Sequence, residues 1–188
     1  MRHKETPIST KINHLSGSES KWFAIYTKYK CEKYVTERLG KKGIAAYVPI
    51  ITKIKQYTSR IKRFEVPLIN CYVFVKITKD QYVKVLETEY IMSFIKQRGN
   101  LISIPDNEIN LLKRIVGEIE DVSAGKIEME LGDEVEIIGG NLTGIKGRLI
   151  DNQGKNKFVI RLVSLGMQLN MTVDTSLLRL LKRKAIEL

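Results

Sequence analysis

The stretch Arg60–Lys76, RIKRFEVPLINCYVFVK, decides how this chain is organised. Its first four residues carry three cations, and it then becomes almost wholly apolar from 66 to 75, with Pro67 between the two halves. A run rich in Val, Ile, Tyr and Phe that is too short to cross a membrane indicates a central strand buried on both faces. The sequence therefore places a charged surface beside an apolar one, which suits nucleic acid on one flank and a protein partner on the other.

Length and charge limit the possible classes of protein. The 188 residues allow one ordinary domain or two small ones, and 43% of them are hydrophobic, which is enough to build cores. The net charge of +11 is unevenly spread: residues 20–120 hold 19 Lys or Arg against 10 Asp or Glu, whereas residues 121–188 hold 10 against 9. Such a basic field attracts phosphate backbones, and binding through it weakens with salt. A basic surface that only keeps the protein soluble is the alternative, because charge alone does not define a site.

Cysteine and histidine usage argues against redox, metal or catalytic chemistry. The chain begins without an apolar signal region and has no run long enough to cross a bilayer, so we expect a cytoplasmic protein with reduced thiols. Cys31 and Cys71 are expected to be small core side chains. His3 and His14 lie in the polar first 20 residues, outside any expected fold. Since no carboxylate pair, cysteine or lysine has a recognisable catalytic arrangement, we expect a binding protein without a cofactor or metal and not an enzyme.

The first two thirds of the chain alternate strand and helix patterns. Residues 1–20 lack apolar periodicity, which predicts a disordered or loosely attached tail. Over residues 21–117 we expect strands at 21–29, 44–51, 66–75, 92–97 and 101–104, and helices at 30–42, at 79–87 and from Pro105 onward. Residues 52–62 alternate polar and apolar side chains and suit either a hairpin arm or a loop. This order suits an α+β domain, a ferredoxin-like α/β sandwich.

The helix expected at 30–42 has two different faces. Cys31, Val35 and Leu39 form a face that we expect to be buried, and Gly43 ends the helix. Beside that face, cations and one aromatic ring recur at helical spacing, forming a stripe of Lys30, Tyr34, Arg38 and Lys41. Single-stranded nucleic acid is gripped by this combination, each stacked base contributing about 1–3 kcal/mol. A solvated helix face fits the same spacing equally well.

The pattern changes in the last third of the chain. Residues 118–127 lose the apolar pattern and become acidic, so we place a linker there. From 128 to 183 the period becomes 2 and Gly and Asn interrupt short strands, which indicates a small SH3-like β-barrel. A helix is also compatible with residues 177–181. Gly139–Lys146 lacks the Gly-Lys-Ser/Thr ending of a phosphate loop, and Gly147 is ascribed to backbone geometry.

Three sequence motifs resemble those of a known protein family. They are WFAIY at 22–26, PLINCYVFV at 67–75, and GDEV at 132–135 followed by Gly139 and GIKG at 144–147. Over about residues 20–182 the chain resembles the NusG family of transcription elongation factors, with an N-terminal domain at 21–117 and a KOW domain at 128–183. General members usually carry Phe-Phe-Pro-Gly-Tyr where this chain has LINCY at 68–72. The chain is therefore more similar to specialised paralogues of the RfaH and UpxY type.

The resemblance implies a monomeric elongation and antitermination factor. In the family, the N-terminal domain docks an apolar patch on the clamp helices of the RNA polymerase β′ subunit and suppresses pausing or termination; paralogues of the UpxY type act at operons such as those for capsular polysaccharides. Positions here that match the patch are Tyr26, Tyr47, Leu68, Ile69, Tyr72 and Phe94. Some of these are expected in the core, because alternate residues of one strand cannot all face outward. Contact with the non-template DNA strand or nascent RNA is implied for Lys28, Lys30, Tyr34, Arg38 and Lys41.

For the KOW domain the resemblance implies docking to ribosomal protein S10 or to the termination factor Rho. The loop after its first strand offers Leu142 and Ile145, which we expect to be exposed apolar anchors. RfaH hides this domain as a helical hairpin, whereas the β-branched pattern here favours a barrel throughout. The alternative function is an RNA- or ribosome-binding structural protein built on the KOW fold, which would bind rRNA and have no affinity for polymerase.

Overall fold

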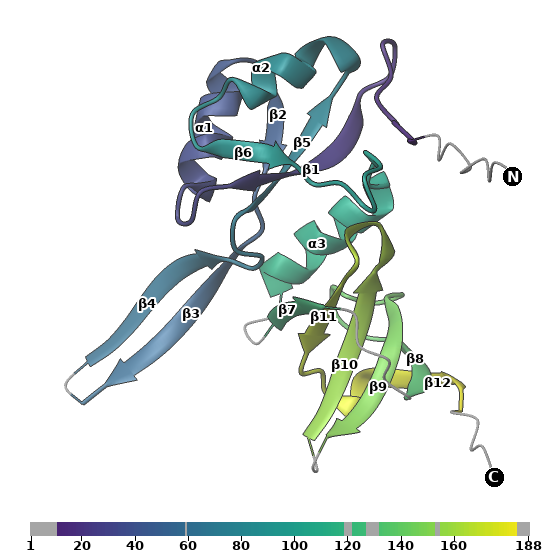
Figure 1. Cartoon of the computed structure of the whole chain (residues 1–188). Helices are drawn as coiled ribbons and strands as arrows, with labels where there is room; N and C mark the ends of the chain where they lie inside the picture. Colours follow the sequence, from purple (N-terminus) through teal and green to yellow (C-terminus); the bar gives the residue numbers. More distant parts are fainter. Residues whose placement is uncertain (1–10, 59, 119–121, 127–131, 153–154, 184–188) are drawn as a thin grey trace, which may run out of the picture.

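The computed structural model describes residues 11–58, 60–118, 122–126, 132–152 and 155–183. Within these ranges the strands form a four-stranded sheet in the order β2-β5-β1-β6, a two-stranded sheet of β3 and β4, and a six-stranded sheet in the order β12-β8-β9-β10-β11-β7 (Figure 1). We call the part built on the first two sheets the N-terminal part and the part built on the six-stranded sheet the C-terminal part.

The four-stranded sheet is the framework of the N-terminal part. It is antiparallel and consists of β1 (Lys21–Thr27), β2 (Ala45–Tyr47), β5 (Tyr72–Ile77) and β6 (Ile91–Phe94). Because successive side chains of a strand point to opposite faces, β1 sends Phe23 and Ile25 to one face and Trp22 and Ala24 to the other. Both faces are therefore buried at this strand, and each is covered by helices.

Two helices cover one face of this sheet, and a single longer helix covers the other. One face packs against α1 (Glu32–Lys41) and α2 (Tyr82–Leu86), the latter preceded by a 3-10 turn, η1 (Lys79–Gln81). The other face packs against α3 (Asp106–Glu118), which contributes Ile109, Leu112 and Ile115 at helical spacing. The expected helix at 30–42 is confirmed, and it ends before Gly43, whose φ of +71° suits glycine.

The strand expected at 66–75 is only partly right, because the central strand β5 begins at Tyr72 and residues 66 and 67 belong to β4. The basic half of the stretch Arg60–Lys76 is β4 (Arg60–Pro67), which pairs with β3 (Ile50–Tyr57), and the apolar half is β5, separated from β4 by the turn Leu68–Cys71. Cys71 has a φ of +63°, a left-handed conformation that is uncommon for a residue other than glycine. Of the two interpretations of residues 52–62, the hairpin arm is confirmed, and the arm projects from the molecule (Figure 1).

The C-terminal part consists of short strands and 3-10 turns. In chain order they are β7 (Val122–Lys126), β8 (Asp133–Ile137), β9 (Lys146–Asn152), β10 (Lys155–Leu162), η2 (Val163–Leu165), β11 (Met167–Met171), η3 (Thr175–Leu177) and β12 (Leu178–Lys182). Gly147 lies where an added Cβ would stand 2.6 Å from the Phe158 ring, so close packing leaves room only for glycine there.

Two expectations about this part need correction. Val122–Lys126 falls in the expected linker, but it forms β7 and pairs with β11 across five residues. The alternation in this segment was masked by small residues, Ser123, Ala124 and Gly125, which carry little strand signal. A helix was also compatible with residues 177–181, but Leu178–Lys182 forms β12, which pairs with β8.

The end of the expected tail is attached to the N-terminal part. Asn13 forms a β-bridge with Leu101, and the backbone carbonyl of Ser16 accepts a hydrogen bond from Lys79. His14, which was expected outside the fold, lies with its Nδ1 3.0 Å from the Ser103 hydroxyl. Residues 1–10 lie outside the described ranges. Over the described residues, no helix is both long and apolar enough to span a membrane.

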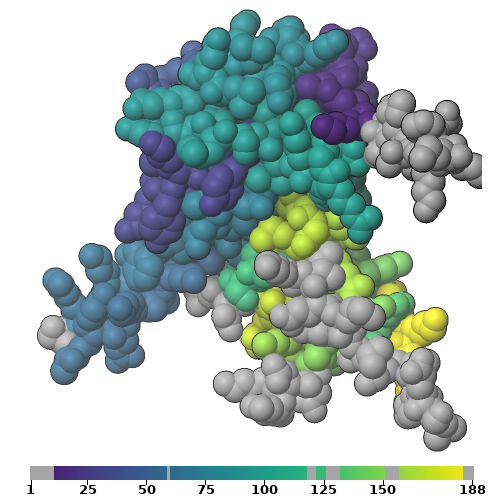
Figure 2. Space-filling view, in the orientation of Figure 1, coloured from purple at the N-terminus to yellow at the C-terminus, as the bar shows by residue number. Residues whose placement is uncertain are grey.

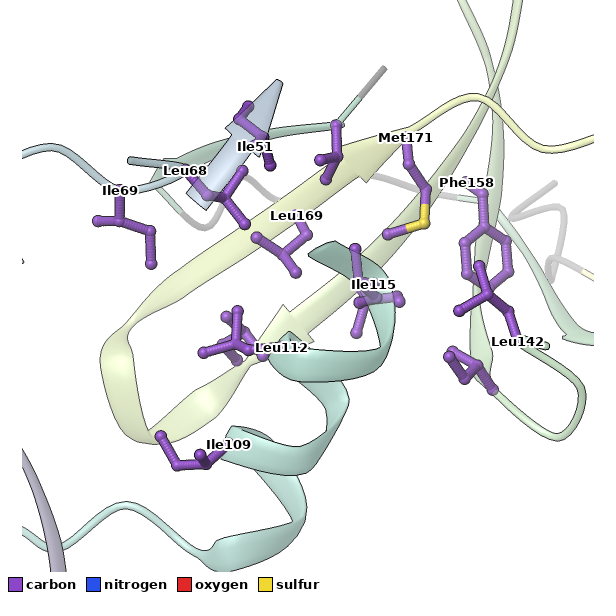
Figure 3. Packing of buried hydrophobic residues seen from close by; sticks show 14 of the residues in the cluster. Ile51, Leu68, Ile69, Ile109, Leu112, Ile115, Leu142, Phe158, Leu169 and Met171 are labelled. Carbon is purple, nitrogen blue, oxygen red and sulfur yellow. The ribbon is translucent and has the colours of Figure 1, made fainter. Parts of the chain in front are cut away.

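One hydrophobic cluster joins the two parts of the molecule. Figure 3 shows Ile109, Leu112 and Ile115 of α3 in the same cluster as Leu169 and Met171 of β11. The cluster extends to Ile51, Leu68 and Ile69 of the N-terminal part and to Leu142 and Phe158 of the C-terminal part. The helix α3 therefore buries side chains against its own sheet and against the C-terminal part.

Candidate functional site

Tyrosines of the expected polymerase patch lie on the α3 face of the four-stranded sheet. Tyr26 of β1 and Tyr72 of β5 are direct cross-strand partners, and their rings meet edge to face with centroids 6.1 Å apart. Tyr26 remains 42% exposed and Tyr72 is half-buried. The neighbouring Cys71 thiol is the main cause that raises the pKa of Tyr26. The pair thus presents aromatic surface to solvent.

Tyr47 lies deeper on the same face. Its ring stacks on Phe74, its cross-strand partner, with centroids 6.3 Å apart, and the Lys113 ammonium lies 5.5 Å from the Tyr47 ring. Burial raises the pKa of Tyr47 to about 12. This residue is therefore mainly a packing residue at the edge of the patch.

The turn Leu68–Cys71 sits beside the aromatic pair but is turned inward. Leu68 and Ile69 are buried in the cluster that α3 and the C-terminal part share (Figure 3). The turn is held by the buried carboxylate of Glu32, which accepts a hydrogen bond of 2.7 Å from the Cys71 N–H, and by the Cys71 carbonyl, which accepts one of 2.8 Å from the Thr27 N–H. Leu68 and Ile69 are thus adjacent to the patch without being exposed in this arrangement.

Phe94 is separated from the other patch residues. It lies on the opposite face of the sheet, buried among the residues that pack against α1 and α2. Its ring stacks on Tyr82 at 4.5 Å and meets Phe23 edge to face at 6.3 Å. The structure therefore brings Tyr26, Tyr47 and Tyr72 together and leaves Phe94 in the core.

The basic stripe on α1 is a connected network. The Tyr34 hydroxyl accepts a hydrogen bond of 2.9 Å from Arg38 Nε and donates one of 2.9 Å to the Glu89 carboxylate. The Arg38 guanidinium also lies 5.3 Å from the Tyr34 ring. Hydrogen bonds from Tyr34 and then Tyr90 keep the pKa of Glu89 below its ordinary value, so this carboxylate stays charged and holds the network in place.

Two aromatic residues that spacing on the helix did not reveal complete this surface. Tyr90, from the loop after α2, meets the Tyr34 ring edge to face at 5.3 Å, and Lys28 lies 5.6 Å from the Tyr90 ring. Tyr29 is 65% exposed, with the Lys30 ammonium 5.3 Å from its ring. The alternation of Tyr29 with two lysines is visible in the sequence and was a usable signal, whereas Tyr90 reaches α1 only through the tertiary fold.

Lys41 lies at the far end of the stripe and has a different environment. It forms an exposed i,i+4 ion pair of 2.5 Å with Glu37, which keeps the pKa of that carboxyl below its ordinary value. A pair of this exposure contributes little to stability. Its positive charge is nevertheless partly offset, so Lys28, Lys30 and Arg38 carry more of the attraction to an anion.

Polar contacts fix the C-terminal part against α3. Arg114 donates hydrogen bonds to the carbonyls of Asn141 and Thr143, at 2.9 and 3.0 Å. Glu108 accepts two hydrogen bonds from Ser164, from its N–H at 3.2 Å and its hydroxyl at 3.0 Å. These contacts come from two separate turns of the C-terminal part, so together they fix the position of the C-terminal part relative to α3.

The expected exposure of Leu142 and Ile145 is wrong. They are only 8% and 5% exposed, because the loop that carries them folds back into the cluster that contains α3 and Phe158 (Figure 3). The Ile145 carbonyl accepts a hydrogen bond from Ile137, which closes the loop. Among the described residues, no group of three or more His, Cys, Asp or Glu side chains is placed to hold a metal ion.

Comparisons with known proteins agree with this architecture. Residues 20–113, half of the chain, match the family model described as transcription termination factor NusG. A transcription termination/antitermination protein NusG from Synechocystis is 25% identical over 172 residues, covering 78% of this chain and 82% of that protein. A solved structure of Thermotoga maritima NusG, titled for its domain interaction, matches with a TM-score of 0.52 and 22% identity, covering 87% of this chain and 98% of that one. This chain belongs to the NusG family of transcription termination and antitermination factors.

Proposed function

We propose that this protein is a specialised elongation and antitermination factor that binds RNA polymerase at the β′ clamp helices and suppresses pausing or termination at particular operons, such as those for capsular polysaccharides. In this proposal the N-terminal part is the ferredoxin-like NusG N-terminal domain and the C-terminal part is the SH3-like KOW domain. Family membership supports the general activity, and the departure LINCY at 68–72 supports a specialised member.

The observation that carries the proposal is the pair of exposed Tyr26 and half-buried Tyr72 beside the Leu68–Cys71 turn. Tyrosine is enriched at protein interfaces because it buries a large, stiff side chain that keeps one polar atom. Both residues belong to central strands that are otherwise buried, so their orientation is fixed before a partner arrives. A rigid, partly exposed aromatic pair of this kind is suited to anchor an amphipathic coiled coil.

The α1 surface is proposed to hold the non-template DNA strand or nascent RNA. A cation lies 5.3 Å from each ring, but Tyr29 is 65% exposed and Tyr34 is 36% exposed, so a base has freer access to Tyr29. The nearby Lys28 and Lys30 would meet phosphates on either side of that base. We therefore expect Tyr29 rather than Tyr34 to be the principal stacking residue.

Binding of S10 or Rho through Leu142 and Ile145 is compatible with this fold only after a rearrangement. Both side chains are buried in the cluster that includes α3, and Arg114 holds the carbonyls of the loop that carries them. A partner that used them as anchors would have to replace these contacts. We propose that partner binding by the C-terminal part is linked to its release from α3.

The test is co-migration of the purified protein with core RNA polymerase, with a fragment of the β′ clamp helices as competitor. Tyr26→Ser should weaken binding at least about tenfold, because interface tyrosines are frequent hot spots. Tyr29→Ser is the matched control, since it removes another exposed tyrosine of the same part and should leave polymerase binding unchanged. Retention of ribosomes or rRNA, with no polymerase bound even at low salt, would instead support the ribosome-binding alternative.

A further inference from the structure

A groove beside α2 has no part in the proposed function. It has a volume of about 410 Å³ and is lined by residues from the segment 11–15, from η1 and α2, and from the stretch 96–101. Figure 2 shows the start of the described chain, in purple, lying against the teal residues of this region. The groove lies on the side of the sheet that α1 and α2 cover, whereas Tyr26 and Tyr72 lie on the α3 face. It is therefore separate from the aromatic pair.

One wall of the groove is the first described segment of the chain, which is held firmly in place. The Ile12 N–H donates a hydrogen bond of 2.9 Å to the Asn100 side-chain oxygen, and the Ile12 carbonyl accepts one of 3.0 Å from the Leu101 N–H. The His14 N–H donates another, also of 3.0 Å, to the Leu101 carbonyl. This wall precedes residues 20–113, which match the family model. The groove is therefore preformed, and part of it is built from sequence outside the matched region.

The floor and part of the rim of the groove are apolar. Leu15, Tyr82 and Leu101 line it and belong to the hydrophobic cluster that α2 covers, either within it or packed against it. At the rim, Ile12 is 51% exposed and Val83 is 58% exposed. Exposed apolar side chains beside a concave apolar floor are typical of a binding surface. The groove is thus suited to receive apolar side chains from a partner.

Lysines supply the charge around this apolar floor. Lys11, Lys79 and Lys96 line the groove, and all three are exposed. None of the described residues that line it is acidic. Over the described ranges, no ion pair involves any of these three lysines. The groove is therefore complementary in charge to a partner that carries carboxylates beside its apolar side chains.

We propose that this groove binds an acidic amphipathic segment of a partner protein. The apolar side chains of the segment lie on the floor, and its carboxylates meet the three lysines, as when an amphipathic helix docks in a groove. Single-stranded nucleic acid fits less well, because bases stack on open aromatic faces. Among the described lining residues the one aromatic ring is Tyr82, and it already stacks on Phe94 with centroids 4.5 Å apart. A second copy of the chain is disfavoured by the net charge of +11 on each copy.

Fluorescence anisotropy tests the proposal with a labelled synthetic peptide that has Leu on one helical face and Glu on the other, titrated with the full chain. Val83→Ser should raise Kd by about threefold or more, because the peptide then buries less apolar surface. Met92→Ser is the matched control: Met92 is 57% exposed, almost as much as Val83, but it does not line the groove. Both substitutions are at exposed positions, so both variants should fold, and a thermal melt checks this.

A second pair of variants tests the charge. Lys79→Gln with Lys96→Gln should raise Kd by about fivefold and weaken its dependence on salt, because two exposed charge contacts are lost. Lys53→Gln with Lys55→Gln removes the same charge from the exposed hairpin arm and should have little effect. Equal losses in the two double variants would mean that only the diffuse positive field attracts the peptide, and would overturn the proposal.

Amide chemical shifts locate the peptide independently of these variants. Changes should concentrate at residues 12–15, 79–84 and 96–101, and changes confined to other surfaces would overturn the proposal. An oligonucleotide that displaces the peptide and depends on Val83 in the same way would reassign the groove to nucleic acid, and self-association abolished by Val83→Ser would reassign it to a second copy. Val83→Ser should still co-migrate with polymerase. Failure of the groove proposal is thereby separated from failure of the proposed function, which Tyr26→Ser tests.

Discussion

The carboxylate of Glu32, in the first turn of α1, accepts a hydrogen bond of 2.7 Å from the backbone N–H of Cys71, in the turn before the central strand β5. Glu32 is one of the few charged residues that the fold buries. The bond ties the helix that carries the basic stripe to the turn that borders the aromatic pair. The two proposed surfaces of the N-terminal part therefore share one internal support.

Replacing Glu32 with Ala should destabilise the N-terminal part by about 1–2 kcal/mol, because the partly buried Cys71 N–H then loses its acceptor. Glu32→Gln keeps an acceptor oxygen and should cost less. Urea denaturation of the three proteins measures the difference. Equal stability of wild type and Glu32→Ala would contradict the role assigned to this bond.

Replacing Cys71 with Gly should stabilise the protein by about 1 kcal/mol. Cys71 has a φ of +63°, a left-handed conformation that costs a non-glycine residue about 1–2 kcal/mol. Glycine adopts it without that cost, although its greater freedom in the unfolded chain offsets part of the gain. Denaturant midpoints measure the change, and Cys31→Gly, at a helix end with φ of −99°, should show no such gain.

Periodicity predicted the elements whose burial is decided locally. The apolar spacing of Val35 and Leu39 in α1 and of Ile109, Leu112 and Ile115 in α3 corresponds to the faces that these helices bury. The division of Arg60–Lys76 was not predictable in this way. It depends on a left-handed Cys71 and on a hydrogen bond to a distant Glu32, and neither leaves a local pattern.

The candidate sites also contain features that local sequence patterns could not predict. Spacing on one helix placed Tyr34 beside Arg38, but it gave no sign of Tyr90, which arrives from another segment. Leu142 and Ile145 lie in a Gly-rich loop between strands, a context that favours exposure, and they are buried because the loop packs into a cluster shared with α3. Tertiary packing decides both outcomes.

Asp106 should make stability depend on pH in the acid range. The ion pair with Lys76 at 3.0 Å, and then the hydrogen bond of 2.9 Å from Trp22 Nε1, hold the pKa of Asp106 below its ordinary value. A lowered pKa in the folded state means that this contribution is present above the unfolded pKa and is lost as the pH falls through the folded pKa. Trp22 is the single tryptophan of the sequence, so its fluorescence reports on this bond.

We therefore expect a change in Trp22 emission with a midpoint below about 3.9, the ordinary Asp value, and no such step in Asp106→Asn. The denaturant midpoint of the wild type should fall across the same interval more steeply than that of the variant. A fluorescence step that persists in Asp106→Asn would assign the titration to another group.

Removing the guanidinium of Arg114 should loosen the C-terminal part from α3. Arg114→Ala leaves the Asn141 and Thr143 carbonyls without this donor, and each of these solvent-exposed hydrogen bonds contributes about 0.5–1 kcal/mol. Asn110→Ala changes an exposed residue of the same helix and is the matched control. Amide hydrogen exchange of the loop at 140–145 should accelerate in the arginine variant alone, because the local opening that exposes these amides becomes less costly.

If binding of a partner through Leu142 and Ile145 requires release from α3, the same variant should bind that partner more tightly, by the factor by which its opening equilibrium constant has increased. Faster exchange without tighter binding would separate the two properties and would place the partner's contacts elsewhere on the C-terminal part.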